Sequence, residues 1–161
     1  MSLTFSQLRD RPEFCTIAAH RMWKAWWEYY SHPLEKVENH LKNDIADAAQ
    51  FPFGIVAHDD ETYIGHCLAI AHDLDQRPDL SPWIAALWVE PDHRRKGIAA
   101  QLMSRAMQEL QALGYKTIYI NAKPSLKEYY PGLGWMLIDQ NQGPDQLDVF
   151  VRNSDLNVQA R

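Results

Sequence analysis

The stretch from residue 83 to residue 113 constrains the fold of this chain more than any other part. The largely apolar run at 83–90 is typical of a strand buried on both faces of a sheet, and Pro91 ends it. Apolar residues then recur at helical spacing and predict a long helix that ends before Gly114. A second strand-like run follows at 116–121. Because a strand, a helix and a strand need a crossover, we expect parallel pairing of the two strands through a right-handed connection.

Shorter patterns complete the order of elements. A hairpin is predicted at 53–58 and 63–71, because two strand-like runs flank the polar turn Asp59-Asp60-Glu61. Pro33 suits the first turn of a helix that Pro52 ends. The other predicted elements are a strand at 3–8, a long aromatic helix at 13–30, a loop at 72–82, a short helix at 125–130, and strands at 135–138 and 146–152.

These elements predict an α/β fold with a mixed, mostly antiparallel central sheet flanked by helices, in the order β-α-α-β-β-β-α-β-α-β-β. A chain of 161 residues has the length of one domain and can bury a core without disulfides or metals. We therefore expect a single domain at 1–153, followed by a polar C-terminal tail at 154–161.

Composition excludes several classes of protein. The formal net charge of −5 and the pI near 5.7 argue against binding to bulk nucleic acid or to an anionic membrane, because both call for a basic face. Cys15 and Cys67 form no CxxC pair, and the seven histidines show no metal-like spacing, so we expect neither a disulfide framework nor a metal site. Without a signal peptide or a long apolar run, the sequence predicts a cytoplasmic protein.

Three cations, Arg94, Arg95 and Lys96, stand where the long helix begins. Exposed N–H groups and the helix dipole make this place unfavourable for positive charge, so an anion is expected to compensate. Gly97, placed in the first helical turn, lets a ligand approach the backbone closely. The plain alternative is a basic surface helix with Asp92 as its cap. A phosphate site is favoured because open α/β sheets bind ligands at the carboxyl ends of their strands.

The residues from Leu87 to Met103 resemble the GNAT superfamily of acyl-CoA-dependent N-acyltransferases. Arg94, Gly97 and Ala99 match the spacing of its Gln/Arg-x-x-Gly-x-Gly/Ala signature. The resemblance implies acetyl-CoA as co-substrate, held by the backbone amides of Arg95 to Ala99 with support from Arg94. The cofactor-binding residues that it implies are Leu87, Trp88, Val89, Arg94, Arg95, Lys96, Gly97, Ile98, Ala99 and Asn121.

The segment 129–135 is similar to the tyrosine segment of the same family, and Tyr130 occupies the tyrosine position. The resemblance implies that Tyr130 protonates the departing thiolate and that the N–H of Val89, or of a neighbour, meets the oxyanion. Pro131 predicts that Tyr130 leaves helical geometry. The alternative is an ordinary packing tyrosine with its hydroxyl at the surface.

A general base and an acceptor site are also expected. Glu90, at the end of the motif strand, and Glu28, on the aromatic helix, are the candidate bases, with water-mediated deprotonation as the alternative. Five aromatic residues between Trp23 and Tyr30 exceed what one buried stripe uses, although aromatic residues at this spacing are usually core. Through cation–π contacts and charge, the following residues are expected to bind a cationic amine: Trp27, Glu28, Asp73 and Asp75, with Asp79 nearby on the same loop.

The sequence thus predicts an N-acetyltransferase that moves acetyl from acetyl-CoA to a primary amine by direct attack in a ternary complex. A cysteine-linked intermediate is not expected, because neither cysteine lies in the motifs. The alternatives are a non-catalytic acyl-CoA-binding or sensing domain and a phosphate-loop protein for another nucleotide. The acceptor is a small-molecule or peptide amine, with no nucleic acid or membrane partner, and apolar C-terminal strands leave a homodimer open.

Overall fold

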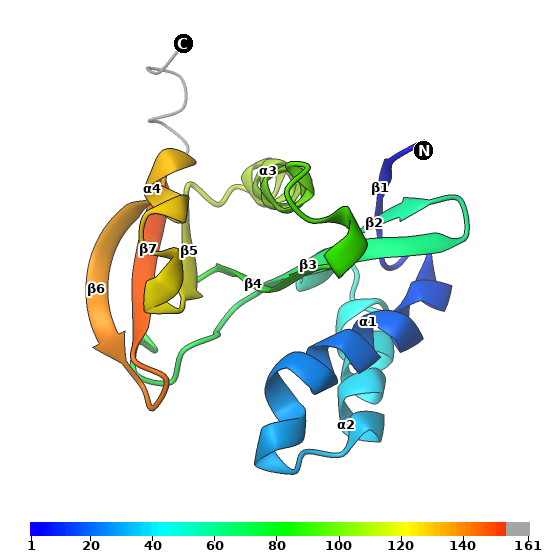
Figure 1. Cartoon of the computed structure of the whole chain (residues 1–161), viewed down its shortest axis with the longest axis horizontal. Coiled ribbons are helices and arrows are strands. Elements are labelled where there is room, and N and C mark those ends of the chain that lie inside the picture. The colour runs from blue at the N-terminus through cyan, green and yellow to red at the C-terminus, as the bar shows by residue number, and fades with distance from the viewer. Residues whose placement is uncertain (154–161) are drawn as a thin grey trace. The chain divides into compact units, whose positions relative to one another are not determined.

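A computed structural model describes residues 1–153, and the predicted tail at 154–161 lies outside them. The strands are β1 (Thr4–Gln7), β2 (Phe53–Asp59), β3 (Thr62–Ile70), β4 (Trp83–Val89), β5 (Thr117–Ala122), β6 (Met136–Gln142) and β7 (Leu147–Asn153). The α-helices are α1 (Cys15–Met22), α2 (Leu34–Asn39), α3 (Ile98–Ala112) and α4 (Tyr129–Gly132). This sequence of elements confirms the predicted order (Figure 1).

The strands form one sheet in the order β1-β2-β3-β4-β5-β7-β6. Pairing is antiparallel between β1 and β2, β2 and β3, β5 and β7, and β6 and β7. The strand pair β4 and β5 is parallel, with Trp83 opposite Tyr119. The predicted mixed, mostly antiparallel sheet and the predicted parallel crossover are both confirmed.

The chain divides into two compact units. Unit 1 comprises Met1–Ala69 and Ala86–Ala106, and unit 2 comprises Ile70–Ala85 and the chain from Met107 onward. Both β4 and α3 therefore contribute residues to each unit. The expected single domain at 1–153 stays a prediction.

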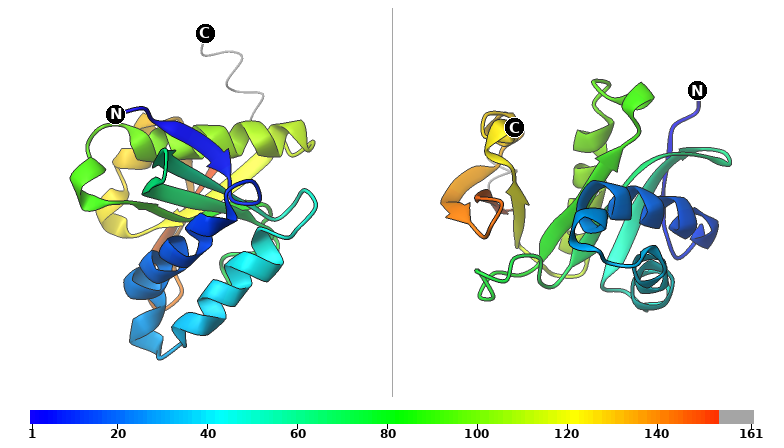
Figure 2. Two further views of the ribbon diagram at one scale, coloured as in Figure 1. Left: turned by 90° about the vertical axis from the view of Figure 1, so that its right-hand side faces the viewer. Right: turned by 60° about the horizontal axis from the view of Figure 1, so that its bottom comes forward.

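Unit 1 holds its core on both faces of β2 and β3. Helices α1 and α2 pack against each other on one face, and the beginning of α3 lies on the other (Figures 1 and 2). The thiol of Cys67 on β3 donates to the carbonyl of Leu102 on α3 at 3.5 Å. Cys15 and Cys67 are both buried and unbridged. The first unit is thus a layered α/β structure stabilised by apolar burial.

Unit 2 is built on β5, β7 and β6, with α4 at one end of these strands (Figure 1). Burial alternates along β5, where Ile118, Ile120 and Ala122 face inward, as expected for one covered face. A separate buried cluster joins the loop before β4 to β4 and β7, and its members are Leu74, Leu80, Trp83 and Val149.

The two N-terminal helices differ from the regular helices predicted. The first passes from α1 into a π-helical segment at Trp23–Trp27 and a 3-10 turn at Glu28–Tyr30. The second passes from α2 into a π-helical segment at His40–Ile45. This helix ends at Ile45 and not at Pro52, because turns and bends occupy residues 46–52 before β2 begins.

The C-terminal predictions also need correction. The helix expected at 125–130 is a 3-10 turn at Pro124–Leu126 followed by α4. Tyr130 lies inside α4, contrary to the expectation from Pro131. Pro131 stands in the first turn, where a backbone N–H has no partner within the helix, so the helix tolerates a proline there. Strand β6 extends to Gln142, four residues beyond its predicted end. Register shifts at Leu137/Asp139 and Asp139/Gln142 interrupt the alternation of the strand, so its second half has no regular strand pattern in the sequence.

Within residues 1–153, no helix has both the length and the apolarity to cross a bilayer.

Candidate active site

The loop between β4 and α3 has the backbone of an anion site. After a 3-10 turn at Pro91–His93, Arg95 and Gly97 take left-handed conformations, with φ of 61° and 79°. Gly97 caps the helix and does not lie in its first turn as expected, since its carbonyl accepts the N–H of Gln101 at 3.2 Å. A Cβ on Gly97 would meet no atom within 4 Å. The space beside Gly97 is thus open where α3 begins, and the N–H groups of a first helical turn, which have no partner within the helix, suit a phosphate.

The cations of this loop have different surroundings. The Nε of Arg94 donates to the carbonyl of Val89 at 2.8 Å, and the guanidinium lies 4.6 Å from the ring centroid of Trp88. Arg95 and Lys96 are exposed. Arg94 is exposed as well, but two contacts hold it against the end of β4.

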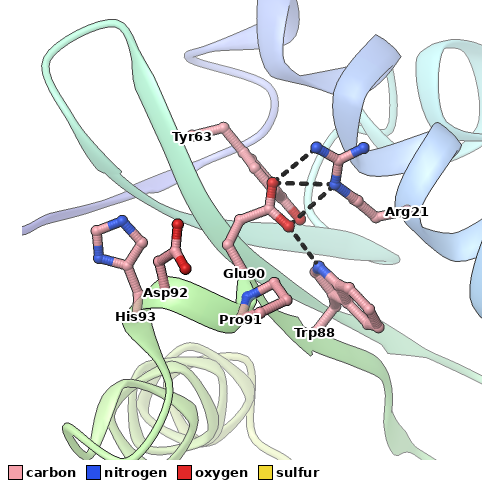
Figure 3. A pocket seen from close by; sticks show the side chains of 7 residues that line it. All are labelled: Arg21, Tyr63, Trp88, Glu90, Pro91, Asp92 and His93. Carbon is pink, nitrogen blue, oxygen red and sulfur yellow. Dashed lines mark hydrogen bonds and ion pairs between the residues drawn. The ribbon is translucent and has the colours of Figure 1, made fainter.

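Glu90, directly after β4, forms an ion pair with Arg21 of α1. Its two oxygens receive hydrogen bonds of 2.8–2.9 Å from Arg21, and one of them also receives the indole N–H of Trp88 at 3.0 Å (Figure 3). Partial burial works to raise the pKa of Glu90, but the hydrogen bonds and the charges of Arg21 and Arg94 outweigh it and lower the pKa. The pair ties the motif strand to α1.

A pocket of about 460 Å³ opens at this strand end (Figure 3). Its lining residues are Arg21, Tyr63, Trp88, Glu90, Pro91, Asp92 and His93. All of them belong to unit 1. Glu90 and Asp92 bring two carboxylates to this lining, and Arg21 pairs with that of Glu90, while the guanidinium of Arg94 lies against Trp88. The carboxylate of Asp92 can attract a cationic ligand.

The wall formed by β3 was missed by the sequence analysis. His58 of β2 lies opposite Tyr63 and Ala57 lies opposite Gly65, so Ile64 is an extra residue that forms a β-bulge. The carbonyl of Ile64 accepts the N–H of Glu90 at 2.8 Å. A Cβ on Gly65 would lie 2.5 Å from the carbonyl oxygen of Trp88. A glycine inside a strand run is the sequence signal for such a bulge or close approach.

The aromatic segment from Trp23 to Tyr30 contains no buried residue, so the core interpretation of these side chains is wrong. Trp27 is 39% exposed and Tyr29 is 88% exposed. Trp26 meets Trp88 edge to face, with ring centroids 6.5 Å apart, which connects the segment to the pocket wall. The carboxylate of Glu28 pairs with Lys24 at 3.0 Å.

The predicted site residues of unit 2 fall into two places. The amide of Asn121 donates to the carboxylate of Asp73 at 2.6 Å, which brings a predicted cofactor residue and a predicted acceptor residue together. Asp75 is exposed, and Asp79 is paired with Arg77 at 3.0 Å.

Tyr130 is 6% exposed and packs against the ring of Phe150, with centroids 5.4 Å apart. Burial raises the pKa of Tyr130 to about 12, so its hydroxyl keeps its proton at neutral pH. Tyr130 therefore has a buried ring, as a packing tyrosine does, and a phenol in the protonation state of an acid. No group of three or more His, Cys, Asp or Glu suited to a metal ion occurs among residues 1–153.

Solved structures show the same fold. A mutant form of the spermidine N-acetyltransferase SpeG from Vibrio cholerae aligns with a TM-score of 0.73 and 15% identity, over 99% of this chain and 98% of that chain. An aminoglycoside 6'-acetyltransferase type Ii aligns with a TM-score of 0.70 and 18% identity, over 96% of this chain and 97% of that chain. A GNAT-family acetyltransferase from Staphylococcus aureus Mu50 aligns with a TM-score of 0.69 and 12% identity, over 95% of this chain and 99% of that chain.

Among curated proteins, none gives a match to the sequence. The family model described as "Acetyltransferase (GNAT) family" matches residues 19–135, which include the β4–α3 loop and Tyr130. This match spans well over half of the chain, and the sheet order and the structural neighbours agree with it. The chain belongs to the GNAT acetyltransferase family.

Proposed function

We propose that the protein transfers the acetyl group of acetyl-CoA to a primary amine by direct attack in a ternary complex. The observation that carries this proposal is the loop from Arg95 to Gly97, whose left-handed residues precede α3 beside the pocket at the end of β4. In a chain of the GNAT family, this arrangement supports an anion site beside a cavity that carries carboxylates.

The loop suits the pyrophosphate of coenzyme A. The backbone N–H groups from Arg95 to Ala99 would hold it, because the space beside Gly97 is open and the first turn of α3 has free N–H groups. Arg94 would support it from its position on Trp88, together with the exposed Lys96. Leu87, Trp88, Val89 and Ile98 are proposed to complete the cofactor site. When bound, acetyl-CoA supplies the thioester that the amine attacks.

Two groups of the chain would assist the transfer. The N–H of Val89 would donate to the thioester oxygen as negative charge develops there. Tyr130 would give its phenolic proton to the departing sulfur, since its pKa of about 12 keeps the proton available at neutral pH. Asn121 is proposed to assist on the cofactor side, and its hydrogen bond to Asp73 orients it.

The role of Glu90 as the general base stays a prediction. Each oxygen of its carboxylate already receives two hydrogen bonds, and its pKa is lowered. These contacts favour a positioning role for Glu90 over that of the base. The carboxylate of Glu28 pairs with Lys24 and makes fewer contacts than that of Glu90, which leaves Glu28 as a candidate base. Deprotonation through water, the other alternative, requires no side chain.

The acceptor is proposed to be a cationic amine. The carboxylates that line the pocket would attract an ammonium group, and the exposed rings around Trp27 would offer cation–π contacts. Asp73 and Asp75 are proposed as further acceptor contacts. Two structural neighbours are named for spermidine and aminoglycoside acetylation, so a polyamine and an aminoglycoside head the list of amines to test.

Release of the coenzyme A thiol over an amine panel tests the proposal, with acetyl-CoA in excess. We expect release with at least one amine and a loss of at least tenfold in Tyr130→Phe, with acetyl-CoA affinity unchanged. Stabilisation by acetyl-CoA with no turnover on any amine would instead indicate a sensing domain. Stabilisation by ATP and not by coenzyme A would indicate a different nucleotide, since a ligand stabilises the state that binds it.

A further inference from the structure

Tyr63 is a buried lining residue of the pocket that the family resemblance did not point to. Tyr63 is 6% exposed, and its side chain runs from β3 toward the pair of Glu90 and Arg21 (Figure 3). Its hydroxyl lies 2.5 Å from Nδ1 of His66, which is fully buried. The Nε2 of His66 has no hydrogen-bond partner among the described residues. A buried polar pair with one unpartnered atom calls for an explanation.

The bulge at Ile64 creates this pair. In a regular strand, residues three apart point to opposite faces, so Tyr63 and His66 would be separated. The extra residue shifts the alternation by one and turns both side chains to the same face. The same bulge binds the backbone of Glu90 through the carbonyl of Ile64. The geometry of β3 therefore places Tyr63 and His66 in fixed register with the end of the motif strand.

Several of the other acceptors at this strand end are already occupied, although the carboxylate of Asp92 also lines the pocket. Both oxygens of Glu90 receive donors from Arg21 and Trp88, and the carbonyl of Val89 receives the Nε of Arg94. The hydroxyl of Tyr63 forms one hydrogen bond with Nδ1 of His66, and among residues 1–153 no second hydrogen bond reaches its oxygen. A lone pair of this oxygen is thus free to accept a hydrogen bond from a ligand in the pocket.

We propose that Tyr63 binds the attacking amine, accepting a hydrogen bond from its N–H, and that His66 is a positioning residue that fixes the direction of the Tyr63 hydroxyl. This inference rests on the proposed function and adds the acceptor contact to it. It requires only that the amine nitrogen enter the pocket formed by unit 1. A hydrogen bond from its N–H to Tyr63 leaves the nitrogen lone pair to form the bond to the acetyl carbon.

The pair acts without titrating. Burial raises the pKa of Tyr63 well above its usual range and lowers the pKa of His66 to about 3, with the nearby Glu90 carboxylate opposing the latter shift. Neither group therefore takes up or releases a proton near neutral pH. During transfer the C–N bond forms, the C–S bond breaks, the sulfur takes one proton, and the amine proton leaves through the open pocket to water.

The test measures amine binding separately from turnover. Calorimetric titrations of spermidine, kanamycin and butylamine into the full chain saturated with coenzyme A give acceptor affinities without reaction. In Tyr63→Phe we expect about tenfold weaker binding of whichever amine binds best, with the affinity for coenzyme A unchanged. Tyr119→Phe, on β5 in unit 2, is the matched control and should leave both affinities unchanged.

Variants of His66 separate positioning from base chemistry. We expect His66→Ala to weaken amine binding severalfold and His66→Asn, which retains an acceptor near Nδ1, to recover most of the affinity. In turnover, the effect should appear in KM for the amine, and the pH profile should keep its acidic limb. A pH profile that loses this limb in His66→Ala would overturn the proposal, since His66 would then be the base.

The outcomes distinguish this inference from the proposed function. Tyr63-dependent amine binding without turnover would support the amine site and refute the acetyltransferase proposal. Turnover and amine binding that are both unaffected in Tyr63→Phe would overturn the amine site and leave the acetyltransferase proposal standing. If none of the three amines binds to the protein saturated with coenzyme A, the amine site is also refuted.

Discussion

Single residues in this protein show how local geometry assigns roles that composition leaves open. Arg94 belongs to a run of three cations, and its side chain is fixed by the carbonyl of Val89 and the ring of Trp88. Gly97 is required by its φ of 79° and not by crowding, because a Cβ there would meet no neighbour. The position of each residue relative to the end of β4 decides what it contributes to the loop.

Gly97→Ala tests the anion loop. A left-handed alanine costs roughly 1–2 kcal/mol, so the loop should shift and acetyl-CoA should bind at least fivefold more weakly. Gly114→Ala is the matched control, since it has a φ of 98°, also without neighbours, at the far end of α3. Both variants should lose similar free energy of unfolding, and only Gly97→Ala should lose acetyl-CoA affinity, measured by calorimetry. Equal acetyl-CoA affinities in the two variants would argue against the loop as the cofactor site.

Glu90→Gln tests whether Glu90 acts as the base or as a positioning group. Because Arg21 and Trp88 occupy the carboxylate and lower its pKa, we expect turnover to fall by less than about tenfold, with the acidic limb of the pH profile intact. The measurement is kcat/KM for the amine from pH 6 to pH 9. A loss of a hundredfold or more, together with the disappearance of that limb, would identify Glu90 as the base.

At the scale of elements, β3 is an irregular strand of unit 1 that contributes Tyr63 to the pocket. Its bulge at Ile64 reaches the backbone of Glu90, and Gly65 lets Trp88 approach. Bulges of this kind redirect side chains next to functional sites. The π-helical segment at Trp23–Trp27 has a comparable effect on the first helix, since it lies where the aromatic residues become exposed.

Gly65→Ala should disrupt the contact between β3 and β4. The new Cβ would lie 2.5 Å from the carbonyl oxygen of Trp88, a backbone atom that cannot move alone, so we expect a loss of about 2–3 kcal/mol in the free energy of unfolding. Gly54→Ala is the control, because its Cβ would lie 2.5 Å from the flexible end of Leu8. Urea unfolding of both variants compares the two costs. A larger loss in Gly54→Ala would contradict the rigid contact.

Much of this architecture was predictable because strong periodicity marks it. The hairpin of β2 and β3, the parallel crossover through α3 and the end of that helix at Gly114 all follow from patterns of apolar residues and glycine. The pair of Tyr63 and His66 was not predictable, since a regular strand would separate them. Ala86, at φ 52° within β4, gives no sequence signal, because alanine rarely adopts this conformation and nothing around it marks a bend.

At the scale of the whole molecule, charge is divided rather than uniform. The formal net charge of −5 coexists with three adjacent cations at 94–96 beside α3. An acidic protein with one basic loop suits a single anionic ligand and a cationic acceptor better than a polyanionic surface. The local charge of the loop, and not the net charge of the chain, therefore determines whether an anionic cofactor can bind there.

Stability should depend on pH through His66. Its pKa is about 3 when folded, against 6.5 for an ordinary histidine, so the unfolded chain binds more protons between these values. Stability from this residue is therefore complete above pH 6.5 and falls as the pH drops toward 3, by about 2 kcal/mol at pH 5. Urea unfolding at pH 7.5 and pH 5 measures the change. His66→Phe should show a smaller decrease, and an equal decrease in both proteins would assign the effect to other groups.

The acetyl transfer itself is tested most directly by following the protein, acetyl-CoA and the amine panel together, with thiol release and the mass of the amine product as paired readouts. The predicted result is release of coenzyme A matched by one added acetyl group on an amine, with a rate that falls in Tyr130→Phe. Thiol release with no acetylated amine, or no release with any amine despite saturating acetyl-CoA, would contradict it.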